Sequence, residues 1–319
     1  MALTSFALAL SLSAPATISN EFSFAITVEN QADQPLNLWI PVASDSELQD
    51  VSEIRIQSEG GSPILTVEPE YGNRMAFLTW ESAPANVTVE VTYSVKRWTG
   101  GIHNVRRDLG SADRFLKGDR LVPLGDRYAE IAGEVVKGST IISKVRSIYD
   151  HVIETMEYDY KKESPKLGEG DVAFVCDYKR GNCSDLHSYV ISLARTTGIP
   201  AYLEYGFPIT GIPIPESIPA EGEISGYHCW TWFYDSERGW LPLDASDGRR
   251  WLDSGKSDIK DLLARSLVLE RSAVAVSKGR DIMLFPPQSG GKLNTFIKPH
   301  AEQKGASVPA NWKVRYKRL

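Results

Sequence analysis

The chain has 319 residues, of which 42% are hydrophobic and 24% are charged, and these proportions are typical of a folded globular protein rather than a disordered one. Its formal charge of -6, without any basic stretch, argues against a nucleic-acid binder. No run approaches the roughly 20 apolar residues that a membrane-spanning helix needs. The three cysteines, at positions 176, 183 and 229, form no CxxC pair, so we expect no disulfide framework, no metal site and no cofactor.

The first residues permit two interpretations. Residues 6–14 are apolar and end in Ala14-Pro15-Ala16, as in a signal-peptide remnant, although no Lys or Arg precedes them. The leucines at positions 8, 10 and 12 alternate with small residues, which is the pattern of a strand. Both interpretations stay open, and the first favours an extracytoplasmic location over a cytoplasmic one.

Short alternating segments broken by turn residues follow over positions 20–118. Residues 22–28 and 87–93 show the period of two that is typical of half-buried strands. This spacing predicts an antiparallel β-sandwich, which we assign as an N-terminal domain over residues 1–120.

Helical spacing begins near residue 124. Apolar residues recur at helical intervals over 125–136 and again over 140–156, and Ser139 is the expected N-cap of the second helix. Residues 157–182 are polar and loop-like, and a loop of that length is more often functional than idle.

A third helix begins at Cys183 and is expected to stop at Gly198 and Pro200. Strands are predicted at 201–207, 227–234 and 239–244, the last two joined as a hairpin. The tail from 265 to 319 returns to strand-like segments, including 282–285 and 312–316. We therefore expect a core over residues 121–255 and a C-terminal β segment over 256–319 that packs on it.

Cys183, His228 and Asp244 are the candidate catalytic residues. Cys183 begins a helix with Asn182 as the expected cap, and a helix N-terminus lowers the pKa of a thiol. His228 and Asp244 lie on the two strands of the predicted hairpin, where a carboxylate can fix the tautomer of an imidazole. Taken singly, each has a structural interpretation: a buried cysteine, a packed histidine and a turn cap.

Three further residues are candidates for supporting roles. Tyr178, in the preceding loop, is a candidate second oxyanion donor beside the Cys183 backbone N–H. His187 lies one turn after Cys183 on the same helix face and can contact the cleft or serve in packing. Cys176 precedes Cys183 by seven residues and is the candidate partner of a regulatory disulfide.

Four ordered blocks resemble the transglutaminase-like superfamily, and in particular its bacterial members described as candidate cysteine proteases. The blocks are Arg180-Gly181-Asn182-Cys183-Ser184-Asp185-Leu186-His187-Ser188, Ala194-Arg195-Thr196-Thr197-Gly198-Ile199-Pro200-Ala201, Gly226-Tyr227-His228-Cys229-Trp230 and Gly239-Trp240-Leu241-Pro242-Leu243-Asp244. The resemblance is firm over about 140–250 and weaker in the flanks. It implies an α+β fold with a papain-like transglutaminase core, between the β-sandwich and the C-terminal β segment.

By this resemblance Cys183 is the nucleophile, His228 the general base and later acid, and Asp244 the orienting carboxylate. Two local departures bear on what the cleft accepts. This chain has Ala245-Ser246-Asp247-Gly248 where relatives often have a stretch like Ile-Ser-Glu-Ala, and Tyr202 where Arg is common.

The expected reaction is acyl transfer through a thioester on a protein or peptide amide, resolved by water as in a peptidase or amidase. The same first half-reaction allows a transglutaminase outcome with an amine acceptor. A third interpretation is a non-catalytic scaffold whose β domains bind peptide or glycan. The sequence does not specify the substrate or the oligomeric state.

Overall fold

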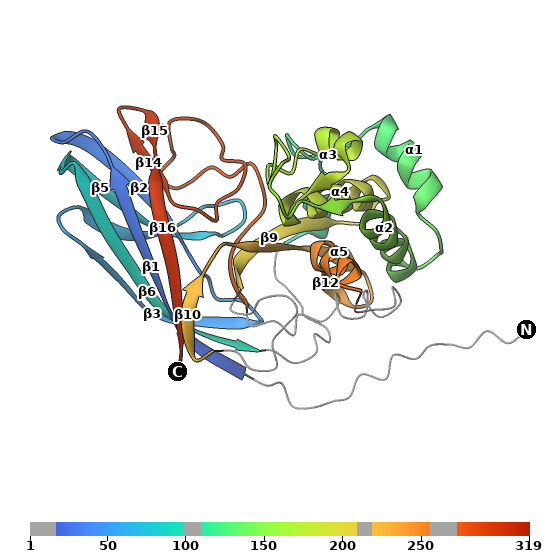
Figure 1. The fold of residues 1–319 in the computed structure, drawn as a ribbon, viewed down its shortest axis with the longest axis horizontal. Coiled ribbons are helices and arrows are strands. Elements are labelled where there is room, and N and C mark those ends of the chain that lie inside the picture. Colours follow the sequence, from blue (N-terminus) through green and yellow to red (C-terminus); the bar gives the residue numbers. More distant parts are fainter. Residues whose placement is uncertain (1–16, 99–109, 209–218, 256–272) are drawn as a thin grey trace, which may run out of the picture.

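The computed structural model describes residues 17–98, 110–208, 219–255 and 273–319. Within these ranges two β-sheets lie on one side of the molecule, and the labelled helices lie on the other side together with β9 and β12 of a third sheet (Figure 1). The residues at 6–16 that permit a strand or a signal-peptide remnant lie outside the described ranges. None of the helices in the described ranges has the length and apolar character needed to cross a membrane.

Two five-stranded antiparallel sheets are built mainly from the N-terminal strands. The first has the order β10-β16-β1-β6-β3, and the second has the order β15-β14-β2-β5-β4. The strands of the first are β1 (Thr17–Glu29), β3 (Gln49–Ser58), β6 (Asn86–Trp98), β10 (Glu221–Ile224) and β16 (Ala310–Arg318). Those of the second are β2 (Gln34–Val42), β4 (Ser62–Val67), β5 (Arg74–Ala83), β14 (His300–Gln303) and β15 (Ala306–Val308).

Alternation along these strands buries one face of each sheet. Phe22, Phe24 and Ile26 on β1 are buried at every second position, and Leu36 and Leu38 on β2 join the same apolar cluster. The period of two in the sequence is therefore the period of burial in the structure. Since β14, β15 and β16 complete the two sheets, a separate N-terminal sandwich over 1–120 stays a prediction.

A third, four-stranded sheet lies beside the helices and has the order β12-β11-β9-β13. Its strands are β9 (Ala201–Pro208), β11 (His228–Asp235), β12 (Gly239–Leu243) and β13 (Ala273–Lys278). The strands and the hairpin expected over 201–244 are thus present. The C-terminal segment that the sequence places on the core is divided: β13 joins this sheet, whereas β14, β15 and β16 join the other two.

Five α-helices and one 3-10 helix complete the described elements. They are η1 (Ala112–Leu116), α1 (Asp126–Val135), α2 (Ile141–Thr155), α3 (Val172–Tyr178), α4 (Cys183–Thr196) and α5 (Ala245–Asp253). A short parallel pair, β7 (Glu157–Tyr158) and β8 (Arg180–Gly181), lies just before α4. Mixed helices and sheets of this kind agree with the α+β class.

The structure differs from the sequence expectation at three places. The N-cap of α2 is Thr140 rather than Ser139, because the Thr140 hydroxyl accepts from the Ser143 N–H and the Ser143 hydroxyl accepts from the Thr140 N–H. The expected loop over 157–182 contains α3, which Asp171 caps. The expected strand over 282–285 is reduced to one bridge between Ile282 and Leu293.

We predict that Gly206→Ala destabilises the fold by about 2 kcal/mol, because overpacking forces backbone shifts. A Cβ at Gly206 would lie 2.1 Å from the Val274 carbonyl oxygen on β13 and 2.8 Å from the Trp230 ring. The measurement is chemical denaturation of both proteins.

Gly133→Ala is the matched control. A Cβ at Gly133 in α1 meets nothing within 4 Å, and alanine is the better helix former, so we expect a gain of about 1 kcal/mol. Equal losses for the two variants would contradict the close approach of β9 and β13 at Gly206.

Candidate active site

Helix α4 begins at Cys183, at a buried position beside the third sheet. Asn182 is its N-cap, and the Asn182 side-chain oxygen accepts from the Ser184 N–H at 2.9 Å. The expected cap is thus present. The first N–H groups of a helix have no acceptor within the helix, so this end carries a partial positive charge. That charge favours the ionised form of the Cys183 thiol.

Asp185 fixes both the start of α4 and the loop before it. Its carboxylate accepts from the backbone N–H groups of Asn182, Gly168 and Gly170 at 2.8 to 2.9 Å. Burial raises the pKa of Asp185 to about 6, although these three hydrogen bonds oppose the increase, and the nearby Cys183 adds to it. Sequence reasoning quoted Asp185 only within a motif, and its position at N3 of a capping box is the signal for this role.

His228 and Asp244 are brought together by the hairpin of β11 and β12. His228 Nε2 lies 2.7 Å from Asp244 Oδ2. The other carboxylate oxygen, Oδ1, accepts from the Asp247 N–H and the Ser246 hydroxyl and caps α5. Asp244 therefore serves both as the partner of an imidazole and as a helix cap, two functions that sequence reasoning treated as alternatives.

The imidazole of His228 is strongly biased towards its charged form. Burial alone would lower its pKa, but the charge and hydrogen bond of Asp244, together with Cys183, raise the pKa of His228 to about 9. A second carboxylate, Asp247, lies 3.5 Å from His228 Nε2 and adds to the negative surroundings. An imidazolium is therefore the resting form near neutral pH.

The Cys183 thiol is biased towards the complementary charge. The pKa of its thiol is held well below the ordinary value, first by a hydrogen bond from the Cys229 thiol and then by His228, against the opposing effect of burial. A thiolate next to an imidazolium is the ion pair that a cysteine nucleophile requires.

The structure also assigns positions to the remaining candidates. His187 lies within the site, with Nε2 accepting from the Ala245 N–H at 2.9 Å. The Tyr178 ring stacks on Phe174, and within the described parts of the chain no hydrogen bond joins Tyr178 to Cys183. Cys176 Sγ lies 3.9 Å from the Tyr189 hydroxyl, and Cys176 and Cys183 are both free thiols here, so the candidate disulfide between them is not formed.

Ligand-type atoms of His228, Asp244 and Asp247 lie within 4.8 Å of one another, a spacing that a metal ion could use. The short contact between His228 Nε2 and Asp244 Oδ2 fits an N–H donor and its acceptor, and the Asp244 oxygens are already engaged in capping. Hydrogen bonding thus accounts for the close approach of His228 to Asp244.

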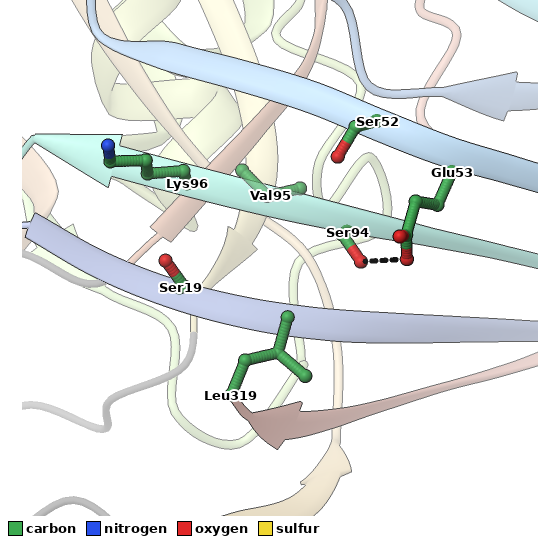
Figure 2. A pocket seen from close by; sticks show the side chains of 7 residues that line it. All are labelled: Ser19, Ser52, Glu53, Ser94, Val95, Lys96 and Leu319. Carbon is green, nitrogen blue, oxygen red and sulfur yellow. Dashed lines mark hydrogen bonds between the residues drawn. The ribbon is translucent and has the colours of Figure 1, made fainter.

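A hollow of about 210 Å³ lies on the first sheet, far along the chain from these residues. Figure 2 shows Ser52, Glu53, Ser94 and Lys96 around it, with the Ser94 hydroxyl donating to Glu53. Its lining holds neither cysteine nor histidine, so it offers no nucleophile.

The comparison with protein families agrees with this geometry. Residues 129–245 match the model of the transglutaminase-like superfamily, and this range contains Cys183, His228 and Asp244. This part of the chain is therefore a transglutaminase-like domain.

Individual relatives are distant. A Haemophilus influenzae protein of uncharacterized function is 22% identical over 315 residues, which cover 89% of this chain and 85% of that protein. The crystal structure of a candidate cysteine protease from Cytophaga hutchinsonii has a TM-score of 0.63 at 16% identity, covering 95% of this chain and 91% of that one. The periplasmic domain of TgpA from Pseudomonas aeruginosa has a TM-score of 0.41 at 15% identity, with coverages of 76% and 92%. The likeness to the Cytophaga structure shows that the fold extends over nearly the whole chain.

We predict that Asp244→Asn lowers the pKa of His228 from about 9, because burial then acts without the opposing carboxylate charge. Asparagine is also a good N-cap, so α5 keeps its start. The measurement is an NMR titration of the His228 ring protons, assigned by their loss in His228→Gln.

Asp253→Asn is the control for removal of a carboxylate. Asp253 ends α5 and binds Arg249 and the Tyr160 hydroxyl, away from the imidazole. We expect no change of the His228 pKa in this variant. An unchanged pKa in Asp244→Asn would show that Asp244 does not hold the imidazolium.

Proposed function

We propose that this protein is a cysteine-nucleophile acyl-transfer enzyme that acts on protein or peptide amides and resolves its thioester with water. The observation that carries the proposal is the buried row of Cys183, His228 and Asp244. In that row His228 lowers the pKa of the Cys183 thiol, and His228 Nε2 lies 2.7 Å from Asp244 Oδ2.

Each residue has one role in the first half-reaction. The Cys183 thiolate attacks the amide carbonyl carbon, and the C–N bond breaks as the His228 imidazolium gives its proton to the leaving amine. Asp244 keeps the ring oriented and stabilises its charge. The Cys183 backbone N–H, in the first turn of α4, is the proposed first donor to the oxyanion.

Hydrolysis of the thioester needs only water and a base. After the amine leaves, His228 is neutral and can take a proton from water as the water attacks the acyl carbon. A transglutaminase outcome uses the same steps with an amine in place of water. We favour hydrolysis because water requires no second binding site.

A non-catalytic scaffold is the weaker alternative. A binding module has no use for a buried thiolate and imidazolium, since holding such charges away from water is costly unless they are paired. Here His228 is paired with Asp244, Asp244 also accepts from a backbone donor, and His228 lowers the pKa of the Cys183 thiol. Such an arrangement is typical of a reaction centre.

We predict that p-nitrophenyl acetate, an activated acyl donor, gives a burst of nitrophenolate stoichiometric with the protein and an acetyl group on Cys183. The burst is lost in Cys183→Ala and slowed by about 10-fold or more at neutral pH in His228→Ala, because loss of the His228 charge raises the pKa of the Cys183 thiol and reduces the thiolate fraction. Stopped-flow absorbance and peptide mass spectrometry are the measurements.

Cys176→Ala is the control, because this buried cysteine lies outside the row and its loss should leave the burst intact. Glycine ethyl ester is then added as an amine acceptor. If the rate of deacylation does not change, the result supports hydrolysis. If the acetyl group is transferred to the amine, the result supports the transglutaminase outcome. Acetylation spread over surface lysines without a burst would contradict an activated nucleophile.

We predict that the pH dependence of acyl transfer differs from that of alkylation. The leaving amine needs the proton of His228, whose pKa is about 9, so the rate of amide cleavage should fall as pH rises through 9. Alkylation by iodoacetamide needs only the thiolate, so it should fall on the acid side alone. If the rates of amide cleavage and of alkylation both fell as pH rises through 9, the result would contradict the role of His228 as the acid.

A further inference from the structure

Two carboxylates face the same nitrogen of His228. Asp247 is fully buried at the third residue of α5, and its Oδ2 lies 3.5 Å from His228 Nε2. The Oδ2 of Asp244 lies 2.7 Å from the same nitrogen. The mechanism above assigns a role to Asp244 and none to Asp247.

The position of Asp247 is fixed by its own backbone and by the packing of α5. The Asp247 N–H donates to Asp244 Oδ1 at 2.9 Å, as expected for the third residue after a helix cap. The next residue, Gly248, lies against α2, where a Cβ would overlap the Tyr149 hydroxyl. The first turn of α5 therefore has little freedom to carry this carboxylate away from the imidazole.

Arg250 lies on the other side of the Asp247 carboxylate. Its Nη1 lies 3.6 Å from Asp247 Oδ1, one turn further along α5, and its guanidinium lies 5.2 Å from the centre of the Tyr158 ring. The side chain of Arg250 is 29% exposed, whereas that of Asp247 is 0% exposed. The carboxylate of Asp247 thus lies between a buried imidazole and a guanidinium that reaches the surface.

The charges around His228 give Arg250 a reason to be there. Two carboxylates beside one imidazolium leave an excess of negative charge in a buried place, which is costly unless another cation offsets it. Arg250 supplies that cation. The titratable and charged groups around the imidazole are Cys183 and His187 on α4, Tyr158 on β7, Glu204 on β9 behind the Trp230 ring, Cys229 on β11, and Asp244, Asp247 and Arg250 at α5.

The two carboxylates also decide which ring nitrogen exchanges its proton. Since both face Nε2, the proton on that nitrogen is held by charge and hydrogen bonding. The proton that His228 gives to the leaving amine, and later takes from water, is therefore the one on Nδ1. How firmly Nδ1 holds it depends on the negative charge that faces the ring.

We propose that Asp247 is a second positioning carboxylate for the His228 imidazolium and that Arg250 moderates its charge. Both residues act through His228 rather than on the substrate. The proposal deepens the proposed function and rests on it, because it concerns the acid and base of that reaction.

The test is an NMR titration of the His228 ring protons in two variants. Asp247→Asn keeps the shape of the side chain and removes its charge, so the pKa of His228 should fall from about 9 by about one unit. Arg250→Met keeps the apolar stem and removes the guanidinium, so the same pKa should rise. The rise should be about half a unit, because Arg250 is farther away and partly exposed to solvent.

Deacylation of Cys183 after reaction with p-nitrophenyl acetate is the second measurement. It needs neutral His228 as the base, so its rate increases as pH rises through the pKa of His228. This increase should move to lower pH in Asp247→Asn and to higher pH in Arg250→Met. Opposite movements distinguish a change of charge from a loss of packing.

Arg249→Met is the matched control for Arg250→Met. Arg249 is the preceding residue on α5, and it binds Asp253 and the Ile153 carbonyl oxygen. We expect no change of the His228 pKa in this control. Thermal unfolding identifies any variant that does not fold, and the partly exposed Arg250 keeps the proposal testable if Asp247→Asn does not fold.

The outcomes separate this proposal from the function on which it rests. Absence of the acylation burst from the wild type would remove the proposed function. A normal burst with a His228 pKa that is unchanged in both variants, or moves in the same direction in both, would overturn only the roles of Asp247 and Arg250. Opposite pKa changes that the deacylation profile does not follow would also overturn those roles.

Discussion

The buried N-terminus of α4 is the constraint on which the rest of the site depends. A helix that starts in the interior brings backbone N–H groups without partners out of water, and each needs an acceptor. Asn182 accepts from the Ser184 N–H, and Asp185 accepts from three backbone groups in the preceding segment. The residues that satisfy the helix start thus also hold the loop around Cys183. The candidate nucleophile is placed by hydrogen bonds to the backbone around it rather than by its own side chain.

The start of α5 repeats this arrangement on the opposite side of the site. One oxygen of Asp244 caps the helix and the other contacts His228. The freed Ala245 N–H of the same turn donates to His187. Backbone groups at two helix N-termini therefore satisfy polar side chains of the site, and this helps to hold such a polar cluster in an apolar core.

Local sequence patterns predict the site better than they predict the sheets. The short turn between β11 and β12 makes His228 and Asp244 neighbours, and an Asn before an apolar helix is a direct signal for a start at Cys183. The proximity of Cys229 to His187 depends on how α4 packs against β11, across 42 residues of sequence. The pairing of β1 with β16 joins the two ends of the chain, and alternation cannot identify such a partner because every half-buried strand shows the same pattern.

Other long-range contacts join the sheets to the candidate site. Asn73, in the turn before β5, exchanges two hydrogen bonds of 2.8 Å with the backbone of Lys278 at the end of β13. Two residues later, Arg280 donates to the Ser188 hydroxyl on α4 at 2.6 Å and to the Glu169 carbonyl in the preceding loop at 2.7 Å. The sheet residues thus reach α4 through largely buried polar contacts, each of which is costly to break once its partner is lost. Because the framework of Cys183 includes these contacts, the sheets are better described as structural support for the site than as an independent binding module.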